Sequence, residues 1–236
     1  MTYVMSDLHG CHAQFLQMCE QIDLKDSDDL FLLGDFVDRG AQPIPLLLDC
    51  MNRINVYPLM GNHEELFLRC AEKLSEQATP ENFYERYFAE VQELCTPWVQ
   101  NGGEVTLMQY LALSAAQRQA VLQYLTEFRL YDRCVVGGVP YLLTHSGLQN
   151  FEKNKPLTAY AAEDFLCARP QPDTVYDTEE VLIFGHTPTI AFLPEGAKAE
   201  VYFTESFINI DCGAVFPDAG GRLACLRLED RKVFYV

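Results

Sequence analysis

The stretch GDFVDRG, residues 34–40, decides how this chain folds around its chemistry. It places two carboxylates, Asp35 and Asp38, beside one guanidinium, Arg39. The apolar run 30–33 directly before it predicts a buried strand. Charged groups at the mouth of a buried strand are costly unless something compensates them. A metal ion can compensate Asp35 and a phosphate can compensate Arg39, so the stretch predicts a site that brings the two together.

Length and composition are those of one globular chain. The 236 residues suffice for a single large α/β domain, and apolar residues make up 49% of them. No apolar run approaches the roughly 18 residues of a membrane helix, and the N-terminus MTYVMSDLHG carries no basic segment of a secretion signal. We therefore expect a cytoplasmic protein without a membrane partner. The net charge of −17 also argues against nucleic acid as a partner, because phosphate backbones bind basic surfaces.

Five apolar runs predict buried strands, and each ends in side chains of a metal-ligand type. The runs are 2–5, 30–33, 55–60, 141–143 and 181–184. The polar side chains that follow them are, in chain order, Asp7 and His9, Asp35 and Asp38, Asn62 and His63, His145, and His186. In open α/β sheets, ligands bind beyond the carboxyl ends of the strands, so five strand ends in one sheet can converge on one point. One of the chain's five histidines, His12, falls outside these motifs.

Each motif taken alone has a structural explanation. Asp7 can cap the helix that follows it, and Asn62 after a glycine is ordinary turn chemistry. A single histidine such as His145 or His186 is more often buried and hydrogen-bonded than a ligand. The joint occurrence of these strand ends, in this order, favours a metal site over the separate explanations.

The predicted ligands are oxygen and imidazole without thiolate, which suits Mn, Fe or Zn better than a soft metal. Two such metals, roughly 3.5–4 Å apart, clamp a phosphoryl group and need a carboxylate that bridges them. Asp35 belongs to the middle motif and is the natural bridge. The other ligands divide between the two metals, with Asp7 and His9 on one and Asn62, His145 and His186 on the other.

Residues 75–130 differ from the rest of the chain, because they look helical and carry no strand-ending motif. Ser114 and Gln117 form a predicted capping box, and a turn is predicted at 101–103. Segments of β type resume after this stretch. We therefore expect one domain over residues 1–236, with a helical insertion at about 75–130.

Three of the motifs resemble the signature of the phosphoprotein phosphatase family of metallophosphoesterases. They are SDLHG at 6–10, GDFVDRG at 34–40 and GNHE at 61–64. HSGL at 145–148 and FGHTP at 184–188 are similar to the two downstream histidine motifs of that family.

Two further segments resemble the bacterial and bacteriophage-lambda type serine/threonine phosphatases. They are the pattern W-x-x-NGG-x-x-T at 98–106 and the closing segment 210–223, and the whole resemblance spans residues 3–228. It implies an α/β fold of the calcineurin-like metallophosphoesterase type, a four-layer αββα sandwich with two mixed β-sheets.

Carried over to this chain, the resemblance implies two divalent metal ions, Mn in the first place with Fe or Zn as alternatives. Their implied ligands are Asp7, His9 and Asp35 for one metal, and Asp35, Asn62, His145 and His186 for the other. A water bound to the metal pair would attack phosphorus directly, without a phosphoenzyme.

The resemblance also implies roles for four residues outside the ligand set. His63 would protonate the leaving oxygen, and Asp38 would orient His63 and hold its charged form. Arg39 would bind the phosphate oxygens, and Arg169 is the candidate for a second phosphate-binding arginine. Arginine suits this task because its planar fork meets two phosphate oxygens at once.

The implied activity is that of a metal-dependent phosphoprotein phosphatase that hydrolyses phosphoserine and phosphothreonine, with phosphotyrosine left open. A hydrolase of dinucleoside polyphosphates or other small phosphoesters is the first alternative. Such enzymes resemble this chain in two motifs but carry Asp after GNH, so Glu64 and the intact DRG favour phosphomonoester or protein substrates. A non-catalytic interaction protein is the second alternative, which the complete ligand set disfavours. A monomer is the default oligomeric state.

Overall fold

Two five-stranded mixed sheets form the centre of the structure, a computed structural model that describes residues 1–194 and 196–236. The strands of the first sheet are β1 (Thr2–Met5), β2 (Asp29–Leu32), β3 (Val56–Pro58), β9 (Ala224–Arg227) and β10 (Val233–Tyr235). Those of the second sheet are β4 (Tyr131–Val136), β5 (Val139–Thr144), β6 (Val181–Phe184), β7 (Tyr202–Phe203) and β8 (Phe207–Asn209). The strand orders are β10-β9-β1-β2-β3 and β4-β5-β6-β8-β7.

Each sheet has a parallel centre and antiparallel edges. In the first sheet β1, β2 and β3 run parallel, while β9 pairs antiparallel with β1 and with β10. In the second sheet β5, β6 and β8 run parallel, while β4 and β7 pair antiparallel with their neighbours. The five predicted strands are therefore present, and three parallel strands in each sheet end at a common edge of that sheet.

The period-two alternation of apolar side chains explains why the two sheets stack. Val4 and Phe31 contribute to the core between the sheets, whereas their neighbours Met5 and Leu32 contribute to the core on the outer face of the first sheet. Successive side chains of a strand point to opposite faces, so a strand buried on both sides reads as a continuous apolar run.

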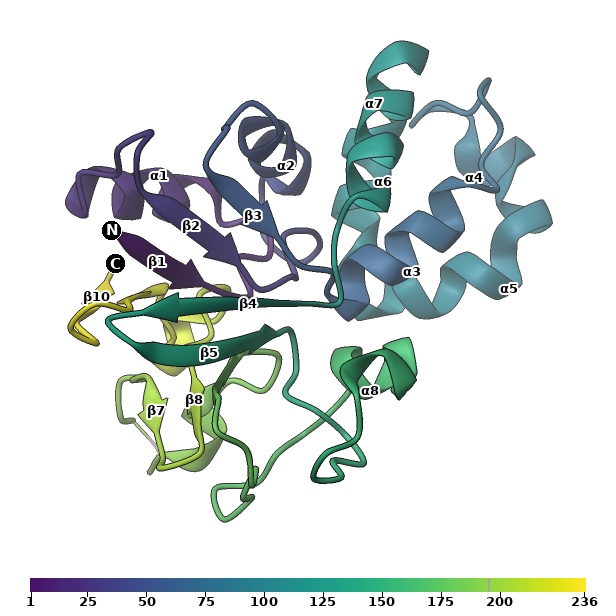
Figure 1. Ribbon diagram of the computed structural model, residues 1–236. Coiled ribbons are helices and arrows are strands. Elements are labelled where there is room, and N and C mark those ends of the chain that lie inside the picture. The colour runs from purple at the N-terminus through teal and green to yellow at the C-terminus, as the bar shows by residue number, and fades with distance from the viewer. Residues whose placement is uncertain (195) are drawn as a thin grey trace.

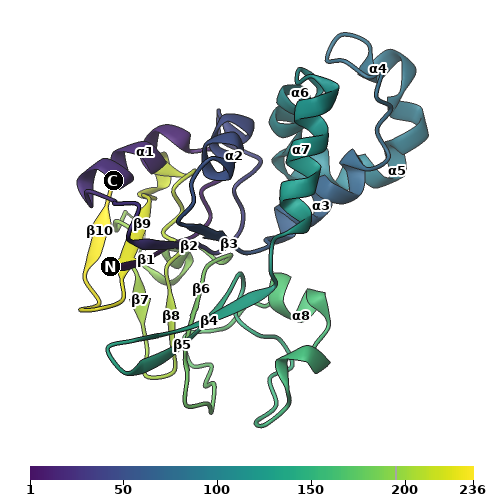
Figure 2. The ribbon, with the colours of Figure 1, turned by 45° about the horizontal axis from the view of Figure 1, so that its top comes forward.

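Helices cover both outer faces of the paired sheets (Figures 1 and 2). The helices α1 (His12–Gln21) and α2 (Pro43–Met51) pack on the first sheet, and Phe15 and Leu47 join its outer core. On the second sheet, α8 (Ala162–Leu166) contributes Phe165 to a separate outer core that includes Leu142. The predicted four-layer αββα sandwich with two mixed sheets is thus confirmed.

The remaining α-helices, with a π-helical turn between two of them, gather at one end of the sandwich (Figures 1 and 2). They are α3 (Asn62–Ala71), α4 (Phe83–Arg86), α5 (Phe88–Trp98), the π-helical turn η1 (Val99–Gly103), α6 (Glu104–Leu111) and α7 (Ala115–Thr126). Ser114 caps α7 as predicted, because its hydroxyl accepts a hydrogen bond from the Gln117 backbone N–H. The turn predicted at 101–103 lies within η1 and is marked by Gly102, whose φ is 101°.

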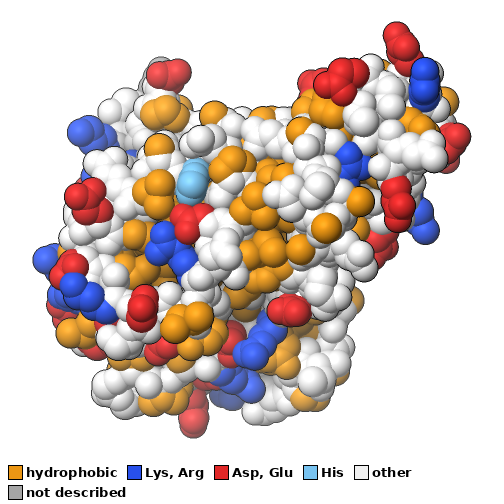
Figure 3. Space-filling model, turned by 90° about the horizontal axis from the view of Figure 1, so that it is seen from above, with side chains coloured by type: hydrophobic (Ala, Val, Ile, Leu, Met, Phe, Trp, Pro, Cys, Tyr) orange, Lys and Arg blue, Asp and Glu red, His pale blue; other side chains and the backbone are white. Residues whose placement is uncertain are grey.

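Acidic and basic side chains are interspersed over the face seen in Figure 3, including the projecting helices. Among residues 1–194 and 196–236, no helix combines the length and apolar character needed to cross a bilayer.

Candidate active site

The carboxyl ends of six parallel strands lead into the polar motifs. Three belong to the first sheet (β1, β2, β3) and three to the second (β5, β6, β8). Strand β8 was not among the five strand ends singled out in the sequence, and it leads to the buried carboxyl of Asp211. The site is therefore built at the seam of two sheets.

The backbone at these strand ends is unusual. Six non-glycine residues there have positive φ, namely Asp7 (52°), His9 (40°), Asp35 (56°), Asp38 (72°), Arg39 (64°) and His186 (67°). Each such conformation costs on the order of 1–3 kcal/mol and persists only where the surrounding structure enforces it. Strain of this kind clusters at functional sites, and here it coincides with the predicted site residues.

One cluster of ligand-type atoms surrounds His145. Its Nδ1 lies 2.7 Å from the Leu33 carbonyl and must donate to it, which leaves Nε2 with a free lone pair. That Nε2 lies 3.0 Å from Asn62 Oδ1 and 3.1 Å from His186 Nδ1. It also lies 3.5 Å from Asp35 Oδ1. Oxygen and nitrogen lone pairs this close repel one another unless a proton, as in the His186 tautomer that carries it on Nδ1, or a cation lies among them.

A second cluster surrounds His9, Asp35 and His63, whose ligand atoms lie within 4.8 Å of one another. His9 Nδ1 donates to the Val37 carbonyl at 2.8 Å, so Nε2 again carries the lone pair, 3.4 Å from Asp35 Oδ2. Arg39 Nη1 donates to this Nε2 at 2.6 Å. The guanidinium supplies positive charge at the point where the lone pairs converge.

These donor sets fit two divalent cations that share Asp35, since its Oδ2 faces His9 and its Oδ1 faces His145. Burial raises the pKa of Asp35 well above its usual range; His63 opposes the shift and the Asp7 charge adds to it. Burial also lowers the pKa of His186 to about 2, with His145 and Arg169 contributing. Bound cations favour ionised carboxylates and neutral imidazoles, so they would oppose the raised pKa of Asp35 and act in the same direction as the lowered pKa of His186.

Asp7 lies beside the two clusters and belongs to neither of them within residues 1–194 and 196–236. Its Oδ2 accepts hydrogen bonds from the Ser6 hydroxyl and, at 2.9 Å, from the His186 backbone N–H. Asp7 is also near enough to the buried Asp211 that its charge, after burial, raises the pKa of that carboxyl. Of the two carboxylates predicted for the first metal, Asp35 is thus the one placed among the imidazoles.

The predicted pair of His63 and Asp38 is present. His63 Nδ1 lies 2.6 Å from Asp38 Oδ2, and both side chains are buried. The opposite ring nitrogen, Nε2, accepts from Arg39 Nη2 at 2.9 Å. His63 is thus oriented by a carboxylate on one side, and its other nitrogen faces the site and the arginine.

Glu64 performs a task that the sequence did not reveal. Its buried carboxylate accepts the backbone N–H groups of Asp35 (2.7 Å), Phe36 (2.8 Å), Val37 (3.1 Å) and Gly61 (3.0 Å). Burial raises its pKa to about 7, against the opposing effect of these N–H donors. The Glu64 carboxylate therefore binds the backbone of the GDFVDRG loop at three N–H groups and the start of its own helix at Gly61.

The Glu64→Gln variant is expected to lose about 3 kcal/mol of unfolding free energy, because an amide cannot accept all these N–H groups and some stay buried without a partner. Denaturant unfolding measures the loss. The matched control is Glu65→Gln, whose partly exposed carboxylate pairs with Arg69 and is expected to change stability by less than about 0.5 kcal/mol. Equal effects of the two substitutions would contradict the role of Glu64.

Two glycines permit the close approach of loops at the site. A Cβ on Gly61 would lie 2.2 Å from Asp35 Oδ1, and a Cβ on Gly102 would lie 2.7 Å from Arg39 Cγ. Gly102 also accepts the Arg39 backbone N–H at 3.0 Å through its carbonyl. The NGG segment therefore packs directly against the arginine of the GDFVDRG loop.

Arg169 lies next to the His186 strand end. Its Nη1 donates to Thr187 Oγ1 at 3.3 Å, next to His186 in the chain, and its side chain is exposed. Its charge contributes to the lowered pKa of His186. The two predicted arginines thus flank the clusters, Arg39 beside His9 and Arg169 beside His186.

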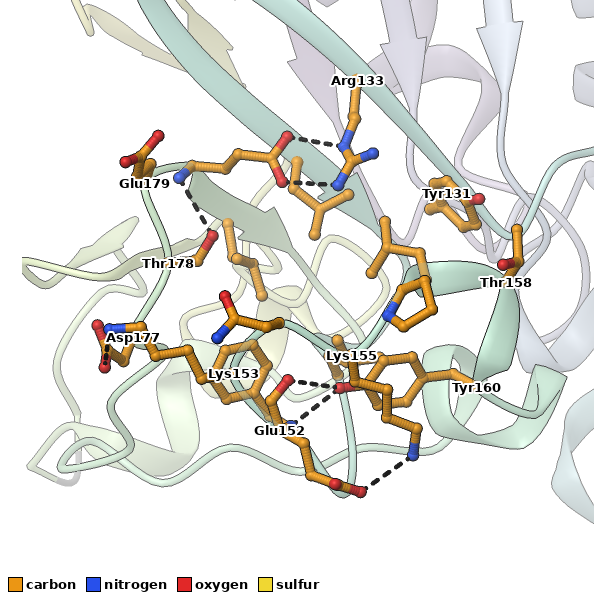
Figure 4. Close-up of a pocket in the computed structure, with 18 residues that line it drawn as sticks. Tyr131, Arg133, Glu152, Lys153, Lys155, Thr158, Tyr160, Asp177, Thr178 and Glu179 are labelled. Carbon is orange, nitrogen blue, oxygen red and sulfur yellow. Dashed lines mark hydrogen bonds and ion pairs between the residues drawn. The ribbon is translucent and has the colours of Figure 1, made fainter.

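A large pocket of about 780 Å³ lies elsewhere, on the outer face of the second sheet near α8 (Figure 4). None of the predicted site residues lines it. Each of its three basic side chains has an acidic partner, Arg133 with Glu180, Lys153 with Asp177 and Lys155 with Glu152. No basic side chain of the pocket is left to bind a phosphate, and the fourth acidic side chain, Glu179, gives the lining a net negative charge.

The site includes residues to which sequence reasoning assigned no role. Trp98 Nε1 and Thr106 Oγ1 both donate to Asp38, and Asn101 Oδ1 accepts from Arg39 Nη2 at 3.3 Å. The signal that could have found them is the W-x-x-NGG-x-x-T pattern, which contains the chain's one tryptophan inside an otherwise helical stretch.

Comparison with known proteins identifies the family of this chain. The sequence pattern of the family described as calcineurin-like phosphoesterase matches residues 2–202. A symmetrical bis(5'-nucleosyl)-tetraphosphatase of Nitrosomonas europaea is 25% identical over 100% of this chain and 97% of its own length. A protein of the same description from Haemophilus ducreyi is 37% identical over 27% of this chain and 24% of its own length.

Solved structures with similar folds carry several descriptions. A proposed diadenosine tetraphosphatase superposes over 100% of this chain and 92% of its own, with a TM-score of 0.67 and 18% identity. A protein serine/threonine phosphatase from Saccharomyces cerevisiae superposes over 100% of this chain and 78% of its own, with a TM-score of 0.54 and 16% identity. At these identities the likeness concerns the fold alone.

Proposed function

The chain belongs to the calcineurin-like phosphoesterases, and on that premise we propose that it is a metal-dependent hydrolase of dinucleoside polyphosphates. The observation that carries the chemistry is the convergence of two lone-pair clusters on Asp35, with the His63–Asp38 pair beside them. The substrate class is supported by the Nitrosomonas europaea relative, which aligns over nearly the whole of both chains.

His9 and Asp35 would hold one divalent ion, and Asp35, Asn62, His145 and His186 the other. Asp7 is the further ligand predicted for the first ion, and its carboxylate lies beside that cluster rather than within it. When bound, the two ions would neutralise the phosphoryl oxygens and make the attacking water more acidic. The protein prepares the site for them by fixing the tautomers of His9 and His145 through the Val37 and Leu33 carbonyls. Mn is the first candidate, with Fe and Zn as alternatives, because the donor set has oxygen and imidazole without thiolate.

His63 would carry the proton for the leaving oxygen at Nε2. Its Nδ1 proton is held by Asp38 at 2.6 Å, so the ring cannot turn and Nε2 stays directed into the site. The carboxylate charge stabilises the imidazolium form that donates the proton. Hydrolysis by direct attack of water then requires no covalent intermediate with the protein.

Arg39, beside His9 and His63, and Arg169, beside Thr187, would bind phosphate oxygens. The Arg39 guanidinium already reaches the His9 and His63 rings, so a phosphate at this point can take over its N–H groups. A substrate with several linked phosphates offers oxygens to both arginines at once, which accords with a polyphosphate chain.

The Arg169→Ala variant is expected to raise KM by about 10- to 100-fold with a smaller change in kcat, because a charge-assisted hydrogen bond contributes about 1.5–3 kcal/mol. Steady-state kinetics on a dinucleoside tetraphosphate measures this split. The control is Arg129→Ala, because the exposed Arg129 side chain pairs with Asp132 and the substitution leaves its backbone hydrogen bond to Met60 in place. An unchanged KM in the Arg169 variant would remove it from the phosphate site.

The sequence argument that Glu64 favours monoesters does not hold in the structure. The carboxylate faces the backbone of residues 35–37 and is fully buried, so it cannot contact a substrate. A glutamate at this position therefore gives no argument for a monoester through direct contact with the substrate. With that argument removed, the curated relatives support the dinucleotide reading over the phosphoprotein reading.

Phosphoprotein phosphatase activity is the second candidate. It is favoured by the complete GDFVDRG motif, whose Arg39 lies against both His9 and His63. The same clusters and the same proton donor would serve a phosphoserine or phosphothreonine monoester.

A metal-by-substrate activity matrix separates the two candidates. Metal-free protein is supplied with Mn, Zn, Fe or Mg and assayed on diadenosine tetraphosphate and on phosphoserine, phosphothreonine and phosphotyrosine peptides. The proposal expects the highest kcat/KM on the dinucleotide. Turnover of a phosphopeptide alone would assign the protein phosphatase activity instead, and no turnover with any metal would overturn both.

A further inference from the structure

Asp38 is held from two sides besides His63. Trp98 Nε1 donates to its Oδ2 at 2.8 Å, and Thr106 Oγ1 donates to its Oδ1 at 2.6 Å. The same threonine hydroxyl accepts the Asp38 backbone N–H at 2.9 Å. Thr106 thus closes a ring of hydrogen bonds onto the backbone and side chain of one residue, and the carboxylate has no freedom to rotate.

Water is excluded from the hydrogen bonds around Asp38. Asp38, Trp98 and Thr106 are each 0% exposed, so water cannot replace either donor. A buried carboxylate is costly unless it is hydrogen-bonded, and donors fixed in place are what keep it both charged and oriented. Of these side-chain contacts to Asp38, the one to His63 involves the proposed proton donor. The other two come from Trp98 and Thr106, in the helical stretch 75–130.

Trp98 also packs against α3, the helix that carries His63. The Trp98 ring stacks on Phe67 with centroids 5.4 Å apart and 21° between the planes. Phe67 lies in α3, which also contains His63 near its first turn. Trp98 therefore contacts the proton donor's helix through its ring face and the donor's partner, Asp38, through its N–H.

We propose that Trp98 and Thr106 are positioning residues for the His63–Asp38 pair, through which the W-x-x-NGG-x-x-T segment sets the direction of His63 Nε2 toward the leaving oxygen. The inference rests on the proposed function for its catalytic meaning. The two donors fix the Asp38 carboxylate, and the carboxylate fixes the His63 imidazole.

The alternative is that both residues only fill the core. A core role predicts that their loss weakens all activities equally through stability. A positioning role predicts a selective loss, because a misdirected proton donor matters most when the leaving group is a poor one. A leaving group that is stable as an anion needs little help from a donor.

The variants separate hydrogen bonding from packing. Trp98→Phe keeps an aromatic ring against Phe67 and removes the N–H donor, and Thr106→Val keeps the shape and removes the hydroxyl. Thr106→Ser restores the hydroxyl and is the rescue variant. The matched control is Thr96→Val on α5, because the buried Thr96 hydroxyl has no hydrogen-bond partner in the structure and its removal is expected to be harmless.

The first measurement is the kcat of metal-loaded protein on phenyl phosphate and on 4-nitrophenyl phosphate. Trp98→Phe and Thr106→Val are expected to lower kcat on phenyl phosphate by about 10- to 100-fold, a share of what a lost general acid costs, with less than about threefold on the nitrophenyl ester. KM is expected to stay the same, and Thr106→Ser and Thr96→Val are expected to behave like the wild type. Equal losses on both esters would overturn the positioning role.

The second measurement needs no turnover, so it separates failure of this inference from failure of the proposed function. Proton NMR follows the Nδ1–H of His63, which a 2.6 Å bond to Asp38 should shift downfield and protect from exchange. In Trp98→Phe and Thr106→Val the resonance is expected to move upfield or broaden, and in Thr96→Val to persist. An unchanged resonance in both variants would overturn the inference even if the wild-type enzyme hydrolyses every ester.

Discussion

The His63→Asn variant is expected to lose about two to four orders of magnitude in kcat on an ester with a poor leaving group, such as phenyl phosphate, while two metal ions stay bound. This is the range expected for a lost general acid. The physical reason is the placement of the ring, whose Nδ1 is held by Asp38 at 2.6 Å while Nε2 faces the site. An asparagine can fill the space but cannot donate a proton of suitable acidity. Steady-state kinetics and metal analysis of the same sample test both halves of this expectation.

The control for this variant is His12→Asn. His12 is the one histidine outside the motifs, and its Nε2 lies 3.0 Å from Asp49 at the surface of α1 and α2. Near wild-type kcat is expected for this control. Full activity of His63→Asn on an ester with a poor leaving group would show that another group supplies the proton.

The Asp35→Asn variant is expected to bind fewer than two metal ions per chain and to be inactive. Both carboxylate oxygens are placed for ligands, Oδ2 at 3.4 Å from His9 Nε2 and Oδ1 at 3.5 Å from His145 Nε2. An amide offers one oxygen and no charge, so it cannot bridge two cations. The loss in metal affinity should exceed the about 10- to 100-fold that mutation of outer-shell partners costs.

Metal content measured after dialysis gives the stoichiometry directly. The control is Asp49→Asn, which removes a carboxylate that pairs with Arg53 and His12 outside the clusters. The control is expected to keep two ions. Two tightly bound ions in the Asp35 variant would mean that this carboxylate is not the bridge.

Much of the fold was predictable because its signals are local. The run 30–33 predicted a strand one residue away from the observed β2, and 2–5 and 181–184 match β1 and β6. The polar ends were predictable because each follows its strand directly in the sequence. These polar ends lie together because parallel strands share one direction. The residue pattern did not show that the strands belong to two separate sheets.

The support around the site was not predictable from residues, because it depends on contacts far apart in the chain. Trp98 and Thr106 lie 60 and 68 positions from Asp38, and Glu64 lies 29 positions from the Asp35 N–H that it accepts. In the sequence, a tryptophan among helical residues indicates core packing, and its hydrogen bond to Asp38 is visible only in the structure. Glu64 next to His63 reads as a residue of the chemistry until its carboxylate is seen to face backbone.

Product analysis of diadenosine tetraphosphate treated with the Mn-loaded protein tests the central claim most directly. Cleavage at the middle of the tetraphosphate yields two molecules of ADP and no other nucleotide. We predict this product pattern for the wild type, its loss on chelation, and its return when Mn is restored. An intact dinucleotide after incubation with each of Mn, Fe, Zn and Mg would contradict the proposed function.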